Sequence, residues 1–292
     1  TTPKAFFNSA GWNFNYWSFW NTAGLPIERA FNTNAHVTLR NNMLINPGIT
    51  ASQLPGTYSD RNSRGGPAVR HSPLVNGFLN FTGDDRKQVI PSFFTNIGRS
   101  DYGHGGWVEV NPSADLRVSS RFHMNLGVDY NHKRDDTQWY GNFTDSADVT
   151  HYTFAHLNQR TLSATLRFDV TATPNLTFQL YASPFVSKGS YSKIREIDDP
   201  RAADYARRYT PYTDETVLAD QPTGFNVKQF RSNAVVRWEY RPGSTLYLVW
   251  TQQRADALPM VGDEGFYGNY GNLFNLHPDN TFLVKMSYWF NR

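Results

Sequence analysis

The chain contains no cysteine, which excludes thiol catalysis, disulfide bonds and thiolate metal sites. It has no run approaching about 18 consecutive apolar residues, so no transmembrane helix is expected. The formal net charge of +3 is spread along the chain rather than gathered into a basic stripe, which leaves nucleic-acid binding without support. The first residues have no basic start, apolar core or small-residue cleavage site, so they are not a signal peptide.

Aromatic residues, in contrast, are abundant. They make up 15% of the 292 residues, although the mean hydropathy is only −0.57. A soluble domain this polar would rarely contain so many large rings. A membrane β-barrel would, because its outer face contacts lipid and its inner face contacts water. A barrel strand needs only about 9–11 residues, of which every second one is apolar.

Apolar and polar residues alternate with the period of a β-strand. From Leu116 to Asn131 the even-numbered positions are mostly apolar and the odd-numbered positions mostly polar, and the same pattern runs from Thr161 to Thr171. We therefore expect an all-β fold, a transmembrane antiparallel up-and-down β-barrel with about 11 visible strands and no helix. The expected strands are 8–20, 29–46, 73–82, 87–100, 105–112, 116–134, 150–172, 176–195, 225–241, 245–256 and 280–291.

Short connections rich in turn residues alternate with long ones. The short ones are 83–86, 111–115, 173–175 and 241–244, and the long ones lie near 47–72, 135–149, 196–224 and 257–279. Barrels of this class have short periplasmic turns and longer extracellular loops. We therefore expect a bacterial outer-membrane location, with the long loops outside the cell and the short turns and C-terminus in the periplasm.

With about 11 strands, the first and last expected strands run in the same direction, whereas single-chain bacterial barrels have an even number. We therefore expect residues 1–292 to form one barrel domain that is incomplete by itself. The missing strands lie either before Thr1 in a longer chain, of which this is the C-terminal part, or on another polypeptide. The ending Tyr288-Trp289-Phe290-Asn291-Arg292 carries aromatic residues like those of outer-membrane proteins delivered to the barrel-assembly machinery.

Several stretches carry a family resemblance: SDRNSRGGP (59–67), HYTFAHLNQRTLS (151–163), PNLTFQLY (174–181) with PFVS (184–187), RSNAVVRWEYRPGS (231–244) and FLVKMSYWF (282–290). In this order and spacing they resemble the outer-membrane β-barrel family of unknown function that usually follows a family 9-like carbohydrate-binding domain. The resemblance implies a barrel at the C-terminal end of a longer protein. No stretch of this chain resembles the carbohydrate-binding domain, and the family supplies no catalytic residues.

The charged residues on the expected inner face are mostly basic. Rings of basic side chains favour anions in a pore; alternatively, the charges pair across strands and fill a closed lumen, as is common in barrels. The candidate lumen-lining residues are Arg40, Arg117, Arg121, His123, Asp129, Arg167, Asp169, Arg231, Arg237, Glu239 and Lys285.

Large aromatic residues lie near the ends of the expected strands on the lipid face. We interpret them as the girdles that mark the two membrane interfaces. Stacking against sugars is an alternative use for Trp139, Tyr140 and the loop at 266–270. The candidate girdle residues are Trp12, Trp20, Tyr130, Trp238, Tyr240, Tyr288 and Phe290.

The histidines and acids do not form a recognisable catalytic or metal site. His123 shares the inner face with Ser119 and Asn125, yet side chains on one face need not meet as a triad. We expect solvated side chains for the histidines at loop margins, at 104, 132, 151 and 156, and for the paired acids at 84–85, 135–136 and 198–199. The alternative for the acids is that their carboxylates bind calcium. We expect no enzyme and no cofactor.

Three functions remain in order of preference. The first is a porin-like channel or transport protein, or a membrane anchor for a partner or N-terminal domain. The second is a cell-surface carbohydrate-binding or uptake protein that uses aromatic outer loops, and the third is an outer-membrane hydrolase. The expected partners are outer-membrane lipid and lipopolysaccharide, a second polypeptide or N-terminal domain, and glycans.

Overall fold

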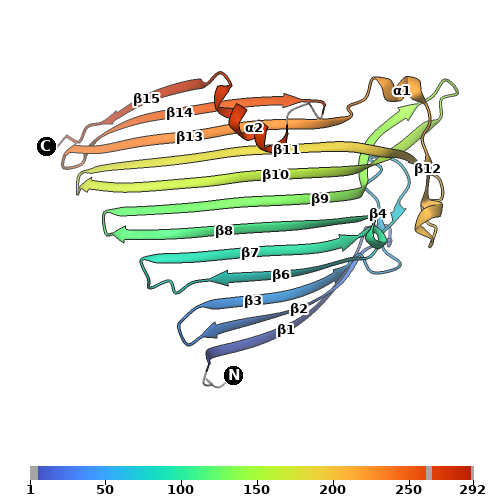
Figure 1. The fold of residues 1–292 in the computed structure, drawn as a ribbon, viewed down its shortest axis with the longest axis horizontal. Helices are drawn as coiled ribbons and strands as arrows, with labels where there is room; N and C mark the ends of the chain where they lie inside the picture. The colour runs from blue at the N-terminus through green and yellow to red at the C-terminus, as the bar shows by residue number, and fades with distance from the viewer. Residues whose placement is uncertain (1–5, 261–264, 291–292) are drawn as a thin grey trace.

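The computed structural model describes residues 6–260 and 265–290, and its dominant element is one large antiparallel β-sheet (Figure 1). Within the described residues, twelve strands pair consecutively in an up-and-down path, and a short thirteenth strand, β12 (Tyr209–Pro211), pairs with β11 beside the path. The strands of the path are β1 (Phe7–Trp20), β2 (Pro26–Leu39), β3 (Leu44–Ser52), β6 (Leu74–Thr82), β7 (Val89–Ser100), β8 (Gly105–Ser119), β9 (Phe122–Thr144), β10 (Thr150–Thr173), β11 (Leu176–Ile197), β13 (Gly224–Arg241), β14 (Ser244–Leu258) and β15 (Asp279–Ser287).

The strand register gathers apolar side chains on one face of the sheet. Val170 of β10 lies opposite Phe122 of β9 and Phe178 of β11. The same row continues through Val236 and Leu248 to Val284 at the edge. We call the face that carries Val170 the apolar face, and the face that carries its neighbour Asp169 the polar face. The predicted all-β, antiparallel, two-faced architecture is confirmed.

The sheet is open, because β1 and β15 form its two edges and no pairing joins them among the described residues. The expectation of a barrel is therefore met only in part: the up-and-down wall is present, and closure is not. Both edges expose large apolar side chains, including Trp12 on β1 and Phe282 on β15, which are 68% and 75% exposed.

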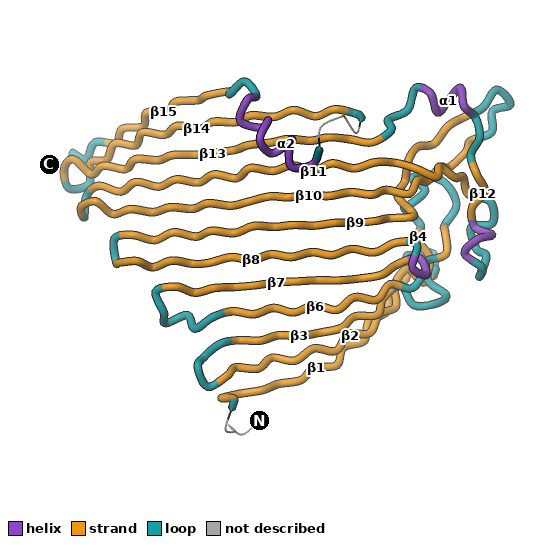
Figure 2. The backbone as a smooth tube through the Cα atoms, in the orientation of Figure 1, coloured by secondary structure: helices purple, strands orange, loops and turns teal. Residues whose placement is uncertain are grey.

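The two ends of the sheet differ (Figure 2). The turn end contains the short connections at 40–43, 83–88, 120–121, 174–175 and 242–243. The loop end contains the connections at 21–25, 53–73, 101–104, 145–149, 198–223 and 259–278. β1 begins and β15 ends at the turn end (Figure 1).

Two predicted strands were wrong because the alternation continues through a hairpin. Arg117 lies opposite His123, and Val37 lies opposite Ile45. In each pair both residue numbers are odd, so the even and odd positions keep their faces across the turn and the hairpin leaves no break in the pattern. Residues 29–46 therefore belong to β2 and β3, and the turn expected at 111–115 lies inside β8. The path has twelve strands in the described residues, so the expected odd strand number was wrong.

The expected long loop at 135–149 was also wrong in most of its length. β9 continues to Thr144 and β10 starts at Thr150, which leaves a connection of a few residues. From Asp135 to Thr144, polar and aromatic residues do not keep to separate even and odd positions, so the alternation that reveals a two-sided strand is missing there. The expected strand at 280–291 corresponds to β15, and position 291 lies outside the described residues.

Short helices and one small ribbon occupy the loops, although no helix was expected. They are β4 (Tyr58–Ser59) paired with β5 (Val69–Arg70), the 3-10 turns η1 (Asp101–Gly103), η2 (Tyr205–Arg208) and η3 (Leu273–Asn275), and the α-helices α1 (Glu215–Ala219) and α2 (Phe266–Asn272). Asp214 caps α1 by accepting hydrogen bonds from the Thr216 and Val217 amides. None of the described helices has the length and apolarity needed to span a bilayer.

Glycines on the polar face accommodate large rings from the neighbouring strand. Gly98 of β7 lies opposite Trp107 of β8, and a Cβ at Gly98 would be 2.3 Å from the indole ring. Gly48 and Phe78 form a similar pair, with a distance of 2.2 Å from the added Cβ to the ring. Each ring covers the backbone that a glycine leaves bare.

We expect Gly98→Val to displace the Trp107 ring and to lower the free energy of unfolding by about 1–3 kcal/mol, the usual cost of overpacking. Gly77→Val on the adjacent strand is the matched control, because a Cβ there meets only the Gly48 carbonyl oxygen at 3.9 Å. Urea unfolding followed by tryptophan fluorescence compares the two variants. Equal midpoints would contradict this packing.

Candidate functional site

Asparagine side chains form a network across the polar face near the β1 edge. The Asn13 amide donates to the Asn34 side-chain oxygen at 3.0 Å, and Asn15 donates to Asn32 at 3.2 Å. Asn34 also donates to Asn32 at 2.6 Å. These bonds, two between strands and one within β2, satisfy the polar side chains of this face. The alternation in the sequence predicts that these asparagines share one face, but it does not predict which of them form hydrogen bonds with each other.

A charged cluster lies on the polar face close to the turn end. Asp115 accepts from His123 Nε2 at 2.8 Å and from Arg117 Nε at 3.2 Å. The other ring nitrogen of His123 is 3.7 Å from Asp169. Three adjacent strands, β8, β9 and β10, thus bring two acids and two basic groups together. Asp115 was missed as a member because the sequence placed it in a turn.

The structure separates the predicted lumen-lining set into strand and turn positions. Arg40 and Arg121 lie in turns at the turn end, which corrects their expected inward strand positions. The other members lie in strands on the polar face by register, and several already have partners: Arg237 contacts Glu239 at 3.1 Å and Asn111 donates to Asp129. Arg167 lies over the Tyr181 ring. The strand members are Arg117, His123, Asp129, Arg167, Asp169, Arg231, Arg237, Glu239 and Lys285.

The polar face is less basic than the sequence suggested. Arg40 and Arg121 do not belong to the strand set, whereas Glu109 and Asp115 lie at polar-face positions. The numbers of basic and acidic side chains on this face are therefore closer to equal. His123 is held by two acids and does not complete a Ser-His pair with Ser119, whose hydroxyl accepts from the Arg121 amide at 3.2 Å.

A second cluster lies at the loop end, where β9, β10 and β11 extend beyond their neighbours (Figure 1). Asp136 of β9 is only 5% exposed. It accepts hydrogen bonds from the Tyr205 hydroxyl at 2.6 Å, from His156 Nδ1 at 2.8 Å and from Arg195 at 3.1 Å. Asp136 and His156 are therefore not the solvated residues expected from sequence. They fasten the loop at 198–223 to the strand ends.

Arg208 joins the two longest described loops at this end. Its side chain is completely buried and donates to the carbonyl oxygens of Ala202, Ala203 and Arg70 and to the Ser72 hydroxyl. The loops at 53–73 and 198–223 are thereby held as one unit, together with an apolar group of Val69, Phe154, Tyr205 and Tyr209. We call this unit the cap, and its components are the two loops and the ends of β9 to β11.

The cap lies over the polar face rather than the apolar one. A cavity of about 510 Å³ is bounded by Arg61 and Arg64 of the cap and by Trp107 and Lys133 of the sheet. The last two residues are at polar-face positions by register. The Arg64 guanidinium lies 3.7 Å from the centre of the Trp139 ring. The space behind the cap is therefore continuous with the polar face.

The aromatic residues considered for sugar stacking are mostly engaged within the protein. Arg64 covers one face of Trp139, and the Tyr140 hydroxyl donates to the Pro222 carbonyl at 3.0 Å. The 266–270 segment forms part of α2, where Tyr267 is exposed and Phe266 is buried. No stacking platform of several exposed rings arises from this set.

Among the candidate girdle residues, the strand register places Trp12, Tyr130 and Trp238 on the apolar face. Trp238 and Tyr240 lie near the turn end of β13, and their rings are 6.0 Å apart. Tyr288 and Phe290 follow β15 at the same end, and Trp20 ends β1 at the loop end. Tyr130 closes the apolar part of β9, whereas Trp12 lies within β1 rather than near an end.

No metal site appears in the part of the chain that the structure describes: histidine, aspartate and glutamate do not gather there in groups of three or more that could hold an ion. Two acids that are adjacent in sequence need not form a cation site. Asp84, for example, forms an ion pair with the Arg86 guanidinium in the same turn, at 2.9 Å. A calcium role for the acid pairs therefore has no support from the geometry.

The fold is a two-faced, up-and-down antiparallel sheet, and the comparison with a solved structure agrees on it. The copper transporter OprC matches with a TM-score of 0.51 and 12% sequence identity, over 96% of this chain and 42% of that chain. This chain thus spans less than half of the transporter's length.

The chain belongs to the DUF5916 family, described as a domain of unknown function, whose profile matches residues 1–291. The predicted membership of a family of unknown function is confirmed, and the preceding carbohydrate-binding domain stays a prediction. No curated protein matches the chain.

A buried acid beside the cap, in the connection between β7 and β8, has a raised pKa. Asp101 in η1 is only 6% exposed, and burial, followed by the charge of Asp135, raises the pKa of Asp101 to about 6. Burial also raises the pKa of Tyr205 above its ordinary value, so that its hydroxyl remains a donor to Asp136. Asp101 therefore stabilises the folded cap fully below its unfolded pKa of 3.8, and this contribution is lost as the pH rises through about 6.

We expect Asp101→Asn to stabilise the cap at about pH 7.5, by up to about 3 kcal/mol, and to leave it nearly unchanged at about pH 4. Hydrogen–deuterium exchange of segment 198–211 measures the difference between variant and wild type at each pH. Asp136→Asn is the control, since it removes the charge that pairs with Arg195 and should loosen the cap at both pH values. Equal protection of wild type and Asp101→Asn at every pH would contradict a buried, suppressed carboxyl.

Proposed function

We propose that this chain forms the wall of an outer-membrane β-barrel, with the polar face toward an aqueous interior and the loop end at the cell surface. The observation that carries the proposal is the continuous apolar face that crosses the whole sheet. It exposes rings such as Trp238 and Trp250, while the opposite face carries networks of hydrogen-bonded polar side chains. In water an apolar surface of this extent would drive aggregation; in lipid it is solvated.

The length of the apolar region supports the same proposal. On β9 the alternating apolar positions run from Phe122 to Tyr130, and on β10 they run from Leu162 to Val170. Each run covers about nine residues, which is close to the span that a tilted strand needs to cross a bilayer. Beyond these runs the same strands continue into the cap.

The proposal requires both sheet edges to be paired in the membrane. An unpaired backbone amide or carbonyl costs several kcal/mol in hydrocarbon, so open edges are not found there. β1 and β15 would therefore pair with each other in a more curved sheet, or with strands of another segment or polypeptide. Either arrangement leaves the polar face inside.

Within this proposal the chain acts as a channel or transport protein, or as a membrane anchor. The near balance of charges on the polar face supports weak ion selectivity if the interior conducts. The cap supports restricted flow, because it covers part of the polar face at the loop end. We propose a non-enzymatic role, which the positions of His123 and Ser119 favour.

For a channel, we expect Arg208→Ala to increase conductance across planar bilayers, because loss of the buried guanidinium releases the two loops of the cap from each other. Arg207→Ala is the matched control, since its side chain is 72% exposed and its ion pair is with Asp199, at 3.6 Å. The reversal potential in a potassium chloride gradient should lie near zero for all three proteins. Protein that enters liposomes yet never conducts, with or without Arg208, would support the anchor and contradict the channel.

A further inference from the structure

Basic side chains gather on the apolar face directly beyond its apolar part. The last apolar row toward the loop end consists of Val110, Tyr130, Leu162 and Val186, which lie opposite one another on β8 to β11. The next row contains Val108, His132, Arg160 and Lys188. The row after that contains Arg99, Gly106, Arg134 and Asn158. We call the last two rows the basic belt.

The arginines of the belt are available to a ligand. Arg99, Arg134 and Arg160 are all exposed, and among the described residues none of them has a salt bridge to an acid. The two rows contain no acidic residue. The charges of the polar face differ, since Arg117 and Arg237 contact acids within 3.2 Å.

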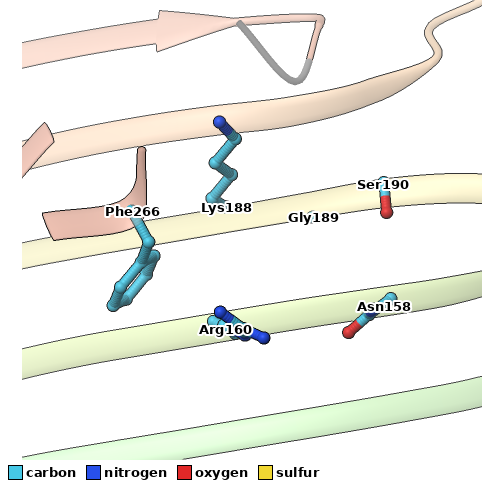
Figure 3. A pocket seen from close by; sticks show the side chains of 6 residues that line it. All are labelled: Asn158, Arg160, Lys188, Gly189, Ser190 and Phe266. Atoms are coloured by element: carbon cyan, nitrogen blue, oxygen red, sulfur yellow. The ribbon is translucent and has the colours of Figure 1, made fainter. Parts of the chain in front are cut away.

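Two hollows lie along the belt. One of about 410 Å³ is bounded by Arg99, His132 and Arg134, and Gly106, which has no side chain, pairs with both arginines across the strands. The other, of about 220 Å³, is bounded by Asn158, Arg160, Lys188 and Phe266 (Figure 3). In this view Arg160 and Lys188 lie on adjacent strands, with the Phe266 ring of α2 beside them.

The position of the belt decides its chemistry. A guanidinium group is costly within hydrocarbon but is stabilised at the level of lipid headgroups, where it binds phosphate through two parallel hydrogen bonds. Three arginines within two adjacent rows therefore fit an anionic headgroup with more than one phosphate. The acyl chains of the same lipid would lie along the apolar rows below.

We propose that the basic belt binds the phosphate groups of lipopolysaccharide in the outer leaflet, with its acyl chains against the apolar face. This inference rests on the proposed function, because it requires the apolar face to contact lipid and the loop end to face outward. It assigns a lipid-binding role to Arg99, Arg134 and Arg160, none of which was singled out from the sequence.

The test uses the folded chain inserted into phosphatidylcholine vesicles that contain bisphosphorylated lipid A. After extraction in mild detergent, native mass spectrometry measures the lipid A that remains bound. Arg99→Gln, Arg134→Gln and Arg160→Gln are combined in one variant, and Arg117→Gln, Arg167→Gln and Arg231→Gln on the polar face form the matched control. Each basic residue near an anionic lipid contributes about fivefold in affinity, so the belt variant should bind about a hundredfold more weakly, while the control binds like wild type.

Three outcomes would overturn the inference while leaving the proposed function intact, provided that protease protection shows insertion. They are equal lipid A retention by the belt variant and wild type, equal loss in the belt and control variants, and displacement of the lipid by millimolar inorganic phosphate, which would indicate a site for free anions. Retention that persists with dephosphorylated lipid A would also contradict it. Failure of the wild type to insert would instead count against the proposed function.

Discussion

The structure depends on one constraint with two parts. Each strand forms its backbone hydrogen bonds with its neighbours, and its side chains alternate between faces that meet two different media. Pairing of consecutive strands meets the first condition along the path, except at the outer edges of β1 and β15, and alternation meets the second. The register then has no freedom, because a shift by one residue would place Asp169 where Val170 lies. The apolar rows, the asparagine network and the charged cluster around Asp115 all follow from this register.

The same constraint explains what could be predicted from the sequence. Strands with one apolar face, such as β10, were found within a residue or two of their ends. The hairpins at 40–43 and 120–121 preserve the alternation and contain neither glycine nor proline, so they were missed, and the Asn111-Pro112-Ser113 stretch imitated a turn. In the structure Pro112 lies within β8, where the pairing with β9 passes from Val110 directly to Ser113, so the missing amide proton falls in an interruption of the ladder.

The cap could not be predicted, because its contacts join segments that are far apart in sequence and follow no period. Arg208 reaches Arg70 and Ser72, and Asp136 reaches Tyr205. An acid in a polar stretch has the same sequence signature whether it is solvated or buried, and only the loop fold decides between them. The helix α2 is a similar case: its glycine-rich sequence has low helix propensity, and a buried hydrogen bond from Asn226 to Asn269 holds it on the sheet.

The central claim is that the two faces of the sheet meet lipid and water, and the absence of native cysteine makes a direct measurement possible. Single cysteines at Leu166, Arg167, Phe168 and Asp169 of β10 are introduced into liposome-inserted protein and labelled with an environment-sensitive fluorophore. The account predicts quenching by lipid-attached quenchers at positions 166 and 168 and by aqueous quenchers at 167 and 169. Equal access of the aqueous quencher to all four positions would contradict it.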